Sequence, residues 1–484
     1  MKGRKILAVV LVLGLGCWGT VAGVRWWGGR CEAMVGPVPA GQKLPSSIHP
    51  VKPTEVNLGP LVEARRVFAR DVLAQAGGTP SLGTLRSVAV AAEENYLVPR
   101  EARQVVGVAD GAPLLLFDED ELRGKLQVNA GILTRLAGDA DGTGWARWYD
   151  GNVLEAAQTP QGLVLAQLPS GKVPQVTSVD PRSGELHWCI PVGGEYATAA
   201  VAAGDSGLFV LSGRDYDEDD PRQPVLSSLD PANGKTRWKT QVDGFENRGT
   251  VDVFGDSVLV TQWGIKTENF FDRPQANHDG GVETDGGSLR AFRADNGRAS
   301  WEYAGPDDSG WAVSVLGIHD STAVVLARRT PVPDHTWDRE DQNWVIGLGP
   351  DGKERWRQDL GNKIKGYARS GVTMAGDVVL RFEDKGGSVA SQTVVARDVS
   401  TGKVRWTKTV DGDHTFRPER FAIADGNLLI ARSHDLVSID LTSGVLRTLL
   451  IDNGLDAELD VKVDDRAIVA QAAGLILTFE RRPR

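Results

Sequence analysis

Residues 179–188 read VDPRSGELHW, and variants of this segment recur along the chain. In each copy an apolar run ends at a polar turn that contains a glycine. Four complete copies follow the first: LDPANGKTRW (229–238), FRADNGRASW (292–301), LGPDGKERW (348–356) and RDVSTGKVRW (397–406). A weaker copy, LAGDADGTGWARW (136–148), precedes them, and IDLTSGVLRT (439–448) comes last, with Thr448 where tryptophan is expected. The repeated glycines lie 40 to 63 residues apart, which is the period of propeller blades rather than of helical or leucine-rich repeats.

Each copy is predicted to form a strand, a tight turn and a returning strand. Glycine tolerates the positive φ that hairpin turns require, and Asp or Asn just before it favours the same region. The tryptophans occupy one fixed position on the returning strand, so we expect their rings to pack each blade against the next rather than to bind a ligand. The predicted blade-docking residues are Trp148, Trp188, Trp238, Trp301, Trp356 and Trp406.

Alternating apolar residues after a turn pair form a second repeated signal, which is typical of half-buried strands. Its eight copies are 110–117, 161–168, 204–211, 255–262, 319–326, 376–383, 425–432 and 464–471. Eight such strands against seven Gly-Trp copies predict an all-β, eight-bladed β-propeller of four-stranded blades, with a seven-bladed ring as the alternative. The last blade would be completed by strands from the N-terminal side, for which residues 87–92 and 103–108 are available. Sharing a blade between the two ends of the chain closes the ring and leaves no long open edge.

The repeated pattern L-D-x-x-[ST/N]-G-K-x-x-W resembles the pyrroloquinoline-quinone-like (PQQ-like) repeat. That family includes quinoprotein dehydrogenases and non-enzymatic bacterial propellers, among them the propeller lipoprotein of the outer-membrane β-barrel assembly machinery. The resemblance covers residues 85–480 and implies the fold. It does not by itself imply a function, because the same repeat serves enzymes, scaffolds and sensors.

The N-terminus has the features of a membrane segment. Residues 6–24 carry no charge and, as a helix, would span about 28 Å, close to the thickness of the bilayer's hydrocarbon core. The basic residues before this segment predict a cytoplasmic N-terminus, with the rest of the chain outside. A retained single-pass anchor over 1–27 is the main prediction. A cleaved signal peptide, giving a secreted protein, and a lipoprotein modified at Cys17 are the alternatives.

Residues 28–83 are predicted to form a proline-rich spacer with a short helix at 58–76, and residues 84–484 the propeller. Outside the cytoplasm, Cys31 in the spacer and Cys189 beside a docking tryptophan could form a disulfide that ties the spacer to one blade. Two unpaired, partly buried thiols are the alternative.

The sequence lacks the motifs that would indicate catalysis. It has no adjacent cysteine pair and no Cys-x-x-Cys-His haem site, so the enzymatic residues of the quinoproteins cannot be transferred. It also lacks a Gly-x-Ser-x-Gly elbow, a phosphate-binding glycine loop and a His-Glu-x-x-His motif. We therefore expect no enzyme activity, no cofactor and no metal. The net charge of −10 argues against a nucleic-acid surface.

Four long insertions fall at the same point of successive repeats, at residues 213–224, 264–287, 329–343 and 384–392. Equivalent connections of a radial repeat leave from the same face, so these loops should stand side by side. Aromatic and histidine side chains within them are predicted to contact a partner: Tyr216, Phe270, Phe271, His278, His335 and Trp337.

Taken together, the sequence predicts a membrane-tethered, extracytoplasmic and monomeric propeller that acts as a protein-interaction scaffold for envelope proteins, without catalysis. A ligand-sensing propeller and a quinoprotein-type oxidoreductase are the alternatives.

Overall fold

The structure is a computed structural model. It describes residues 34–37, 85–90, 103–117, 130–135, 145–150, 152–168, 173–193, 199–213, 224–242, 248–263, 287–307, 311–329, 342–361, 371–384, 391–411, 421–431, 435–451, 460–463, 467–472 and 475–480. Every regular element in these ranges is a β-strand, and no helix among them is long and apolar enough to cross a bilayer. The predicted anchor at 6–24 and the predicted helix at 58–76 lie outside the described residues.

The described strands form eight antiparallel sheets, which we number in chain order from the first inner strand. Sheet 1 contains β3 (Arg103–Ala109), β4 (Ala112–Phe117), β5 (Ala130–Arg135) and β6 (Trp145–Asp150), and β1 (Met34–Pro37) adds a fifth strand beside β6. Sheet 2 contains β7 (Asn152–Thr159), β8 (Gly162–Leu168), β9 (Gln175–Val179) and β10 (Leu186–Pro191). Sheet 3 contains β11 (Ala199–Gly204), β12 (Gly207–Ser212), β13 (Val225–Leu229) and β14 (Thr236–Gln241). Sheet 4 contains β15 (Arg248–Phe254), β16 (Ser257–Trp263), β17 (Leu289–Arg293) and β18 (Ala299–Tyr303).

The second half of the chain repeats the same plan. Sheet 5 contains β19 (Ala312–His319), β20 (Thr322–Arg329), β21 (Gln342–Leu348) and β22 (Glu354–Asp359). Sheet 6 contains β23 (Val372–Ala375), β24 (Val378–Asp384), β25 (Ser391–Asp398) and β26 (Val404–Asp411). Sheet 7 contains β27 (Phe421–Ala424), β28 (Asn427–Ala431), β29 (Asp435–Asp440) and β30 (Leu446–Ile451). Sheet 8 contains β31 (Asp460–Val463), β32 (Ala467–Ala472), β33 (Leu475–Glu480) and the N-terminal strand β2 (Leu85–Val90).

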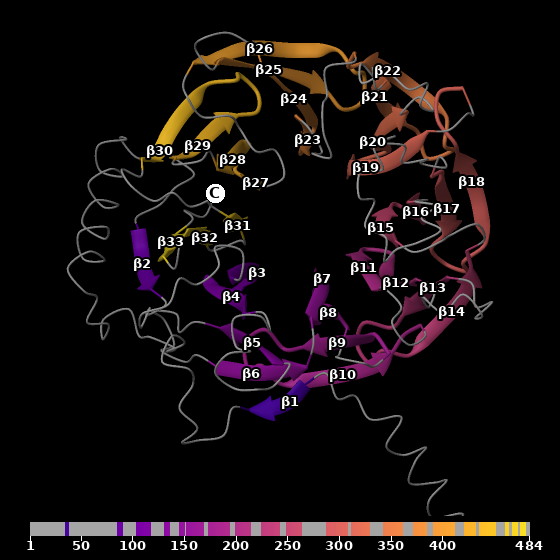
Figure 1. Cartoon of the computed structure of the whole chain (residues 1–484), viewed down its shortest axis with the longest axis vertical. Helices are drawn as coiled ribbons and strands as arrows, with labels where there is room; N and C mark the ends of the chain where they lie inside the picture. Colours follow the sequence, from indigo (N-terminus) through magenta and orange to yellow (C-terminus); the bar gives the residue numbers. More distant parts are fainter. Residues whose placement is uncertain are drawn as a thin grey trace, which may run out of the picture.

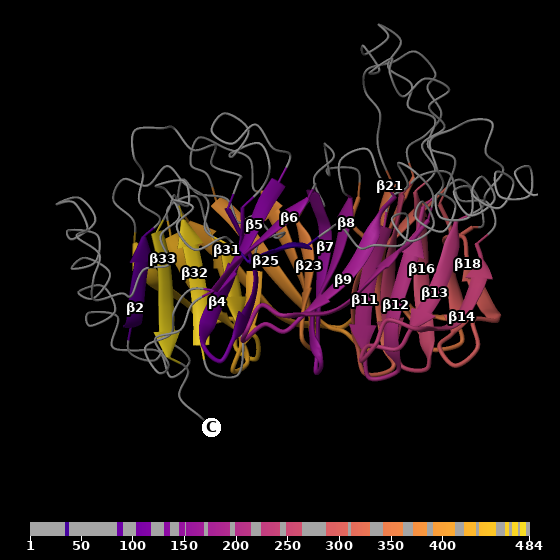
Figure 2. The same ribbon diagram turned by 90° about the horizontal axis from the view of Figure 1, so that it is seen from below.

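The sheets stand around a ring, and their innermost strands are β3, β7, β11, β15, β19, β23, β27 and β31 (Figure 1). Seen from the side, the strands run between the two faces of the ring (Figure 2). The inner strand β31 of the last sheet contacts both β27 of sheet 7 and β3 of sheet 1, so the ring closes. The molecule is a β-propeller, and the eight predicted alternating segments are β4, β8, β12, β16, β20, β24, β28 and β32, the second strands of the eight sheets.

Closure uses one of the two N-terminal segments expected for it. Strand β2 pairs with β33, with Val88 opposite Leu477, and completes sheet 8 as its outer strand. The segment 103–108 instead belongs to β3, the inner strand of sheet 1. The physical reason is local, because Asp110 and Gly111 have positive φ and turn β3 directly into β4. A hairpin of this kind costs far less loop-closure entropy than pairing across the whole chain.

Tryptophan and glycine lock neighbouring sheets together. The Trp188 side chain is 8% exposed, and its ring covers Gly234 in the turn of the next sheet so closely that a Cβ on Gly234 would lie 2.6 Å from it. Its indole N–H also donates to the carbonyl of Pro231, at 2.8 Å. The same pair of contacts recurs at six interfaces, with indole N–H donation from Trp145 to Pro181, Trp188 to Pro231, Trp238 to Ala294, Trp301 to Pro350, Trp356 to Val399 and Trp406 to Leu441.

The first repeat differs from the prediction. There Trp145 makes the locking contacts, with its ring over Gly184. The backbone of Trp148, which was predicted for this role, pairs with Ile132 and Gly36. The side chain of Trp148 lies outside what the structure describes.

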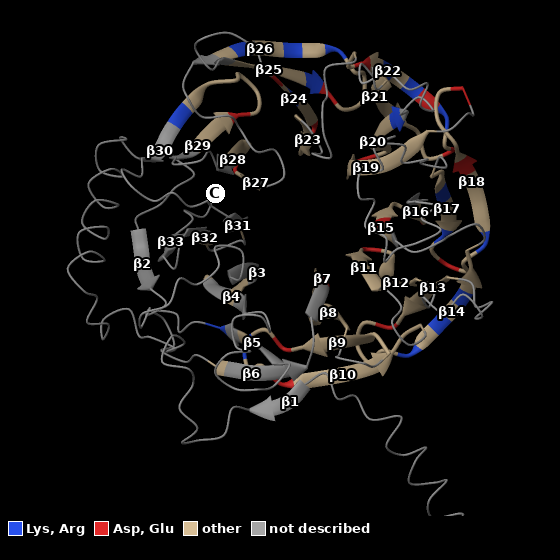
Figure 3. Cartoon of the chain, in the orientation of Figure 1, with Lys and Arg blue, Asp and Glu red and all other residues tan. Residues whose placement is uncertain are grey.

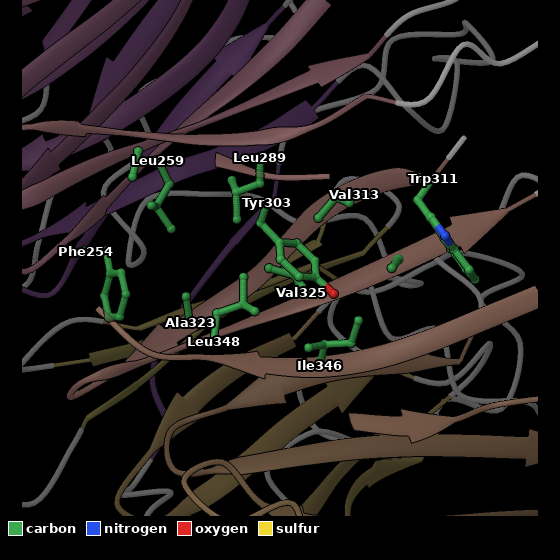
Figure 4. Packing of buried hydrophobic residues seen from close by; sticks show 12 residues of the cluster. Phe254, Leu259, Leu289, Tyr303, Trp311, Val313, Ala323, Val325, Ile346 and Leu348 are labelled. Carbon is green, nitrogen blue, oxygen red and sulfur yellow. The ribbon is translucent and has the colours of Figure 1, made fainter. Parts of the chain in front are cut away.

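The hydrophobic core is divided among the interfaces between sheets. Between sheets 4 and 5, for example, Phe254 and Leu289 pack with Val325 and Leu348 (Figure 4). Trp301 packs against this cluster. Among the described residues, six interfaces bury apolar side chains from both of their sheets in this way, so the sheets at these interfaces stabilise one another.

The outer strands carry many exposed cations, which mark β14, β22 and β26 in blue in Figure 3. The described examples are Arg237, Lys239, Arg355, Arg357, Arg405 and Lys408. Charged side chains on edge strands oppose edge-to-edge association of sheets.

Candidate functional site

The four long connections of the sequence leave from one face of the ring. They join the second strand to the third in sheets 3 to 6, between β12 and β13, β16 and β17, β20 and β21, and β24 and β25. The hairpin between the first and second strands, such as that from Gly204 to Gly207, lies at the opposite end of these strands. Because successive strands are antiparallel, the four connections must begin and end at the same face.

The strand ends beneath this face are well fixed. The buried Ser212 hydroxyl at the end of β12 donates to the carbonyl of Val225 at the start of β13, at 3.2 Å. Ser288, next to the start of β17, donates to the Glu302 carboxylate at 2.6 Å. The connections are therefore mounted on a rigid base, which is the arrangement that loop-borne binding sites require.

The residues predicted to contact a partner lie within these connections and outside the described residues. They are Tyr216, Phe270, Phe271, His278, His335 and Trp337. Their roles stay predictions.

A cavity of about 570 Å³ lies beside the inner strands of sheets 2 to 5. Apolar side chains of β11, β15 and β19 line it together with three carboxylates, Glu155, Asp205 and Asp252. One Glu155 oxygen accepts the backbone N–H of Val201 at 2.7 Å, which links sheet 2 to sheet 3.

The electrostatics of this cavity centre on Glu155. Burial raises the pKa of the Glu155 carboxyl, and the nearby charge of Asp252 raises it further, while the Val201 N–H opposes the rise. Nothing in the sequence analysis pointed to Glu155. The available signal was a lone acid inside the otherwise uncharged inner strand NVLEAAQT.

The described residues bring no metal-binding cluster together. In the ranges that the structure covers, no group of three or more His, Cys, Asp or Glu side chains is placed to hold an ion.

Cys189 lies on β10, the outer strand of sheet 2, and is disulfide-bonded. Its sulfur lies 3.4 Å from the Thr177 hydroxyl of the adjacent strand β9. The partner cysteine is not among the described residues, so the pairing of Cys31 with Cys189 stays a prediction.

Comparison with known proteins agrees with this architecture. A family model described as outer membrane protein assembly factor BamB matches residues 172–330 and 339–454, more than half of the chain. No curated protein matches the chain closely enough to count as a relative.

Solved structures resemble the chain at low identity and with TM-scores below 0.5. BamB from Moraxella catarrhalis is 15% identical with a TM-score of 0.45, and the match covers 82% of this chain and all of that one. The computationally designed protein Ika8 is 12% identical with a TM-score of 0.48, covering 79% of this chain and 98% of that one. The quinohemoprotein alcohol dehydrogenase from Comamonas testosteroni is 12% identical with a TM-score of 0.44, covering 88% and 85%. Likenesses at this level support no conclusion on function.

The Gly-Trp locks, the ring of four-stranded sheets and the family match over most of that ring lead to one assignment: the chain belongs to the PQQ-like repeat propeller family, in the group described by outer membrane protein assembly factor BamB.

Proposed function

We propose that this protein is an eight-bladed, membrane-tethered propeller that binds other envelope proteins as a scaffold and catalyses no reaction itself. The eight sheets of the described residues are taken as its full set of blades. The observation that carries the proposal is the alignment of four long connections at one face of consecutive sheets, on a rigid base. The family match supports it, since the model is described as an assembly factor of the outer membrane.

The binding face is tested by replacing residues 268–285, which lie in the connection between β16 and β17, with a Gly-Ser segment of equal length. Proximity labelling in the native cell should then lose the proteins that the unaltered chain labels. The thermal midpoint should change little, because the strands around the connection stay intact. The matched control is the double substitution of Lys239 and Lys408 to Gln on the outer strands, which should leave labelling unchanged. An unchanged labelling profile for the loop replacement would exclude this face as the binding surface.

The proposed absence of catalysis has its own test. Pyrroloquinoline quinone and Ca²⁺ are added to the purified protein, and the absorption spectrum and the thermal midpoint are recorded. We expect neither to change. A bound chromophore, or a midpoint that rises with quinone concentration, would favour the quinoprotein alternative.

The proposed tether is tested by N-terminal sequencing and by alkaline extraction of membranes. A retained anchor predicts an intact N-terminus and a chain that stays in the membrane pellet. A mature protein that begins after residue 22, or a lipid on Cys17, would replace the anchor with one of the alternatives.

A further inference from the structure

The cavity beside the inner strands of sheets 2 to 5 lies away from the face that carries the four long connections. It reaches Gly204 and Asp205 at the hairpin between β11 and β12, and Gly255 at the hairpin between β15 and β16. Both hairpins lie at the end of the strands opposite to the long connections, because successive strands are antiparallel. The cavity is therefore separate from the proposed binding face.

Most of the cavity wall is apolar and comes from neighbouring inner strands. Strands β11 and β15 stand next to each other in the ring and supply most of this wall (Figure 1). Its apolar side chains are Val201, Ala202, Ala203, Val251, Val253 and Ile318. The volume of about 570 Å³ falls within the range of small-molecule sites, roughly 300–1,000 Å³. The cavity thus has the size and the wall of a site for a small ligand with an apolar part.

Three carboxylates interrupt this apolar wall. They are Glu155 of β7, Asp205 of the hairpin between β11 and β12, and Asp252 of β15. None of the described residues that line the cavity is Lys, Arg or His. A carboxylate in a partly buried, apolar environment is costly unless a cation compensates its charge. The lining therefore favours a positively charged ligand over a neutral or an anionic one.

Glu155 is the acid best placed to receive such a ligand. Its Oε2 accepts the Val201 N–H at 2.7 Å, which fixes the carboxylate beside β11. Its Oε1 accepts no hydrogen bond from any residue that the structure describes. Burial raises the pKa of the Glu155 carboxyl, and the charge of Asp252 raises it further. A cation between Glu155 and Asp252 would offset both effects and use the second oxygen.

The lining suits an ammonium group better than a metal ion. In the part of the chain that the structure covers, no group of three or more His, Cys, Asp or Glu side chains is placed to hold a metal. An ammonium group needs fewer carboxylates, because it donates up to three separate hydrogen bonds. Its methylene stem can also lie against apolar side chains while the charge stays beside a carboxylate.

We propose that this cavity binds a linear aliphatic diamine, with one ammonium group between Glu155 and Asp252, the methylene stem against the apolar wall of β11 and β15, and the second ammonium group beside Asp205. The amine site does not depend on the proposed scaffold role, because the two lie at opposite faces of the ring.

Isothermal titration calorimetry of the full-length protein in detergent tests the site, with cadaverine as the probe. We expect one cadaverine to bind per chain. Pentylamine has the same stem but a single ammonium group, so it should bind roughly ten- to hundredfold more weakly. The uncharged diol of the same length should give no binding heat at the same concentration.

Substitutions then locate the two ends of the ligand. Glu155→Gln and Asp205→Asn should each weaken cadaverine binding roughly ten- to hundredfold, because each removes a carboxylate partner of one ammonium group. Asp205→Asn should also bind cadaverine and pentylamine about equally. Asp256→Asn is the matched control, since Asp256 is an exposed acid of the hairpin between β15 and β16 that does not line the cavity. It should leave the affinity unchanged.

Three results would overturn the amine site: no binding heat at millimolar cadaverine, equal binding of the diol, or unchanged affinity in both cavity variants. The thermal midpoint of each variant without ligand shows whether it is folded. Replacement of residues 268–285 in the long connection should leave cadaverine binding intact, so a failed amine site and a failed scaffold give different results.

Discussion

The Gly402→Ala substitution tests whether contact between tryptophan and glycine holds neighbouring sheets together. Gly402 lies in the turn of sheet 6 with φ +67°, and the ring of Trp356 from sheet 5 covers it. A Cβ at this position would lie 2.7 Å from Cδ2 and 2.8 Å from Cγ of the indole. These ring atoms belong to a side chain that also donates to the Val399 carbonyl at 2.7 Å, so the ring cannot move away without breaking that hydrogen bond.

Two costs add up in this variant. Placing a Cβ on a left-handed backbone costs about 1–2 kcal/mol. Displacing the packed ring costs about 1–3 kcal/mol more. The free energy of unfolding should therefore fall by roughly 2–5 kcal/mol in Gly402→Ala. The matched control is Gly361→Ala, because Gly361 has φ +68° and its Cβ would meet nothing within 4 Å, so only the backbone cost of about 1–2 kcal/mol applies.

Urea unfolding followed by far-UV circular dichroism measures both variants under the same conditions. Adding Gly402→Ala to Trp356→Ala should cost only about as much as Gly361→Ala does, because the ring that clashes is already gone. If Gly402→Ala and Gly361→Ala lose the same stability, the ring does not pack against the glycine and the locking argument is wrong.

Two further predictions concern single contacts. Trp238→Phe keeps an aromatic ring between sheets 3 and 4 but loses the indole N–H that donates to the Ala294 carbonyl at 2.8 Å. The free energy of unfolding, measured by urea titration, should therefore fall by about 1–3 kcal/mol. An unchanged free energy of unfolding would contradict the role of the indole N–H. The pKa of Glu155 is raised in the folded state, so folding favours its protonated form, and the stability this gives is fully present below the unfolded pKa and is lost as pH rises through the folded pKa. Glu155→Gln keeps an acceptor for the Val201 N–H but places no charge beside Asp252. This variant should therefore be more stable than the unaltered protein at pH 7 and lose that advantage on acidification. Thermal midpoints of the two proteins that differ by the same amount at every pH from 4 to 8 would contradict this.

Much of the fold could be predicted because each repeat uses the same glycine turn and the same tryptophan contact between sheets. In each complete copy the tryptophan follows the turn glycine by four residues, as Trp188 follows Gly184. The reason is that six of the described turns use a glycine with positive φ, and at six interfaces a tryptophan ring covers that glycine. The first repeat escaped this reasoning. It carries two tryptophans, and counting from the glycine at 144 selects Trp148, whereas the ring over Gly184 belongs to Trp145. Which of two nearby rings reaches the next sheet depends on the local backbone, which a pattern of spacings does not contain.

The candidate site was less accessible from the sequence. Equal positions of the long insertions predicted one shared face, because strand alternation alone determines where connections leave a sheet. Glu155 was missed, since its raised pKa arises first from burial against neighbouring sheets and then from the charge of Asp252, which is almost a hundred residues away in the chain. Burial and long-range charge are properties of the closed ring and leave no local mark beyond one acid in a strand that otherwise carries no charge.

The amino-acid sequence alone determined the β-strands, their turns, the docking tryptophans after the first repeat and the family, because these follow from local periodicity and from glycine's backbone freedom. Only the tertiary structure decided which N-terminal segment completes the last sheet, which tryptophan locks the first interface and where a carboxylate becomes buried. Those outcomes depend on contacts between residues far apart in the chain, and such contacts exist only once the ring has closed.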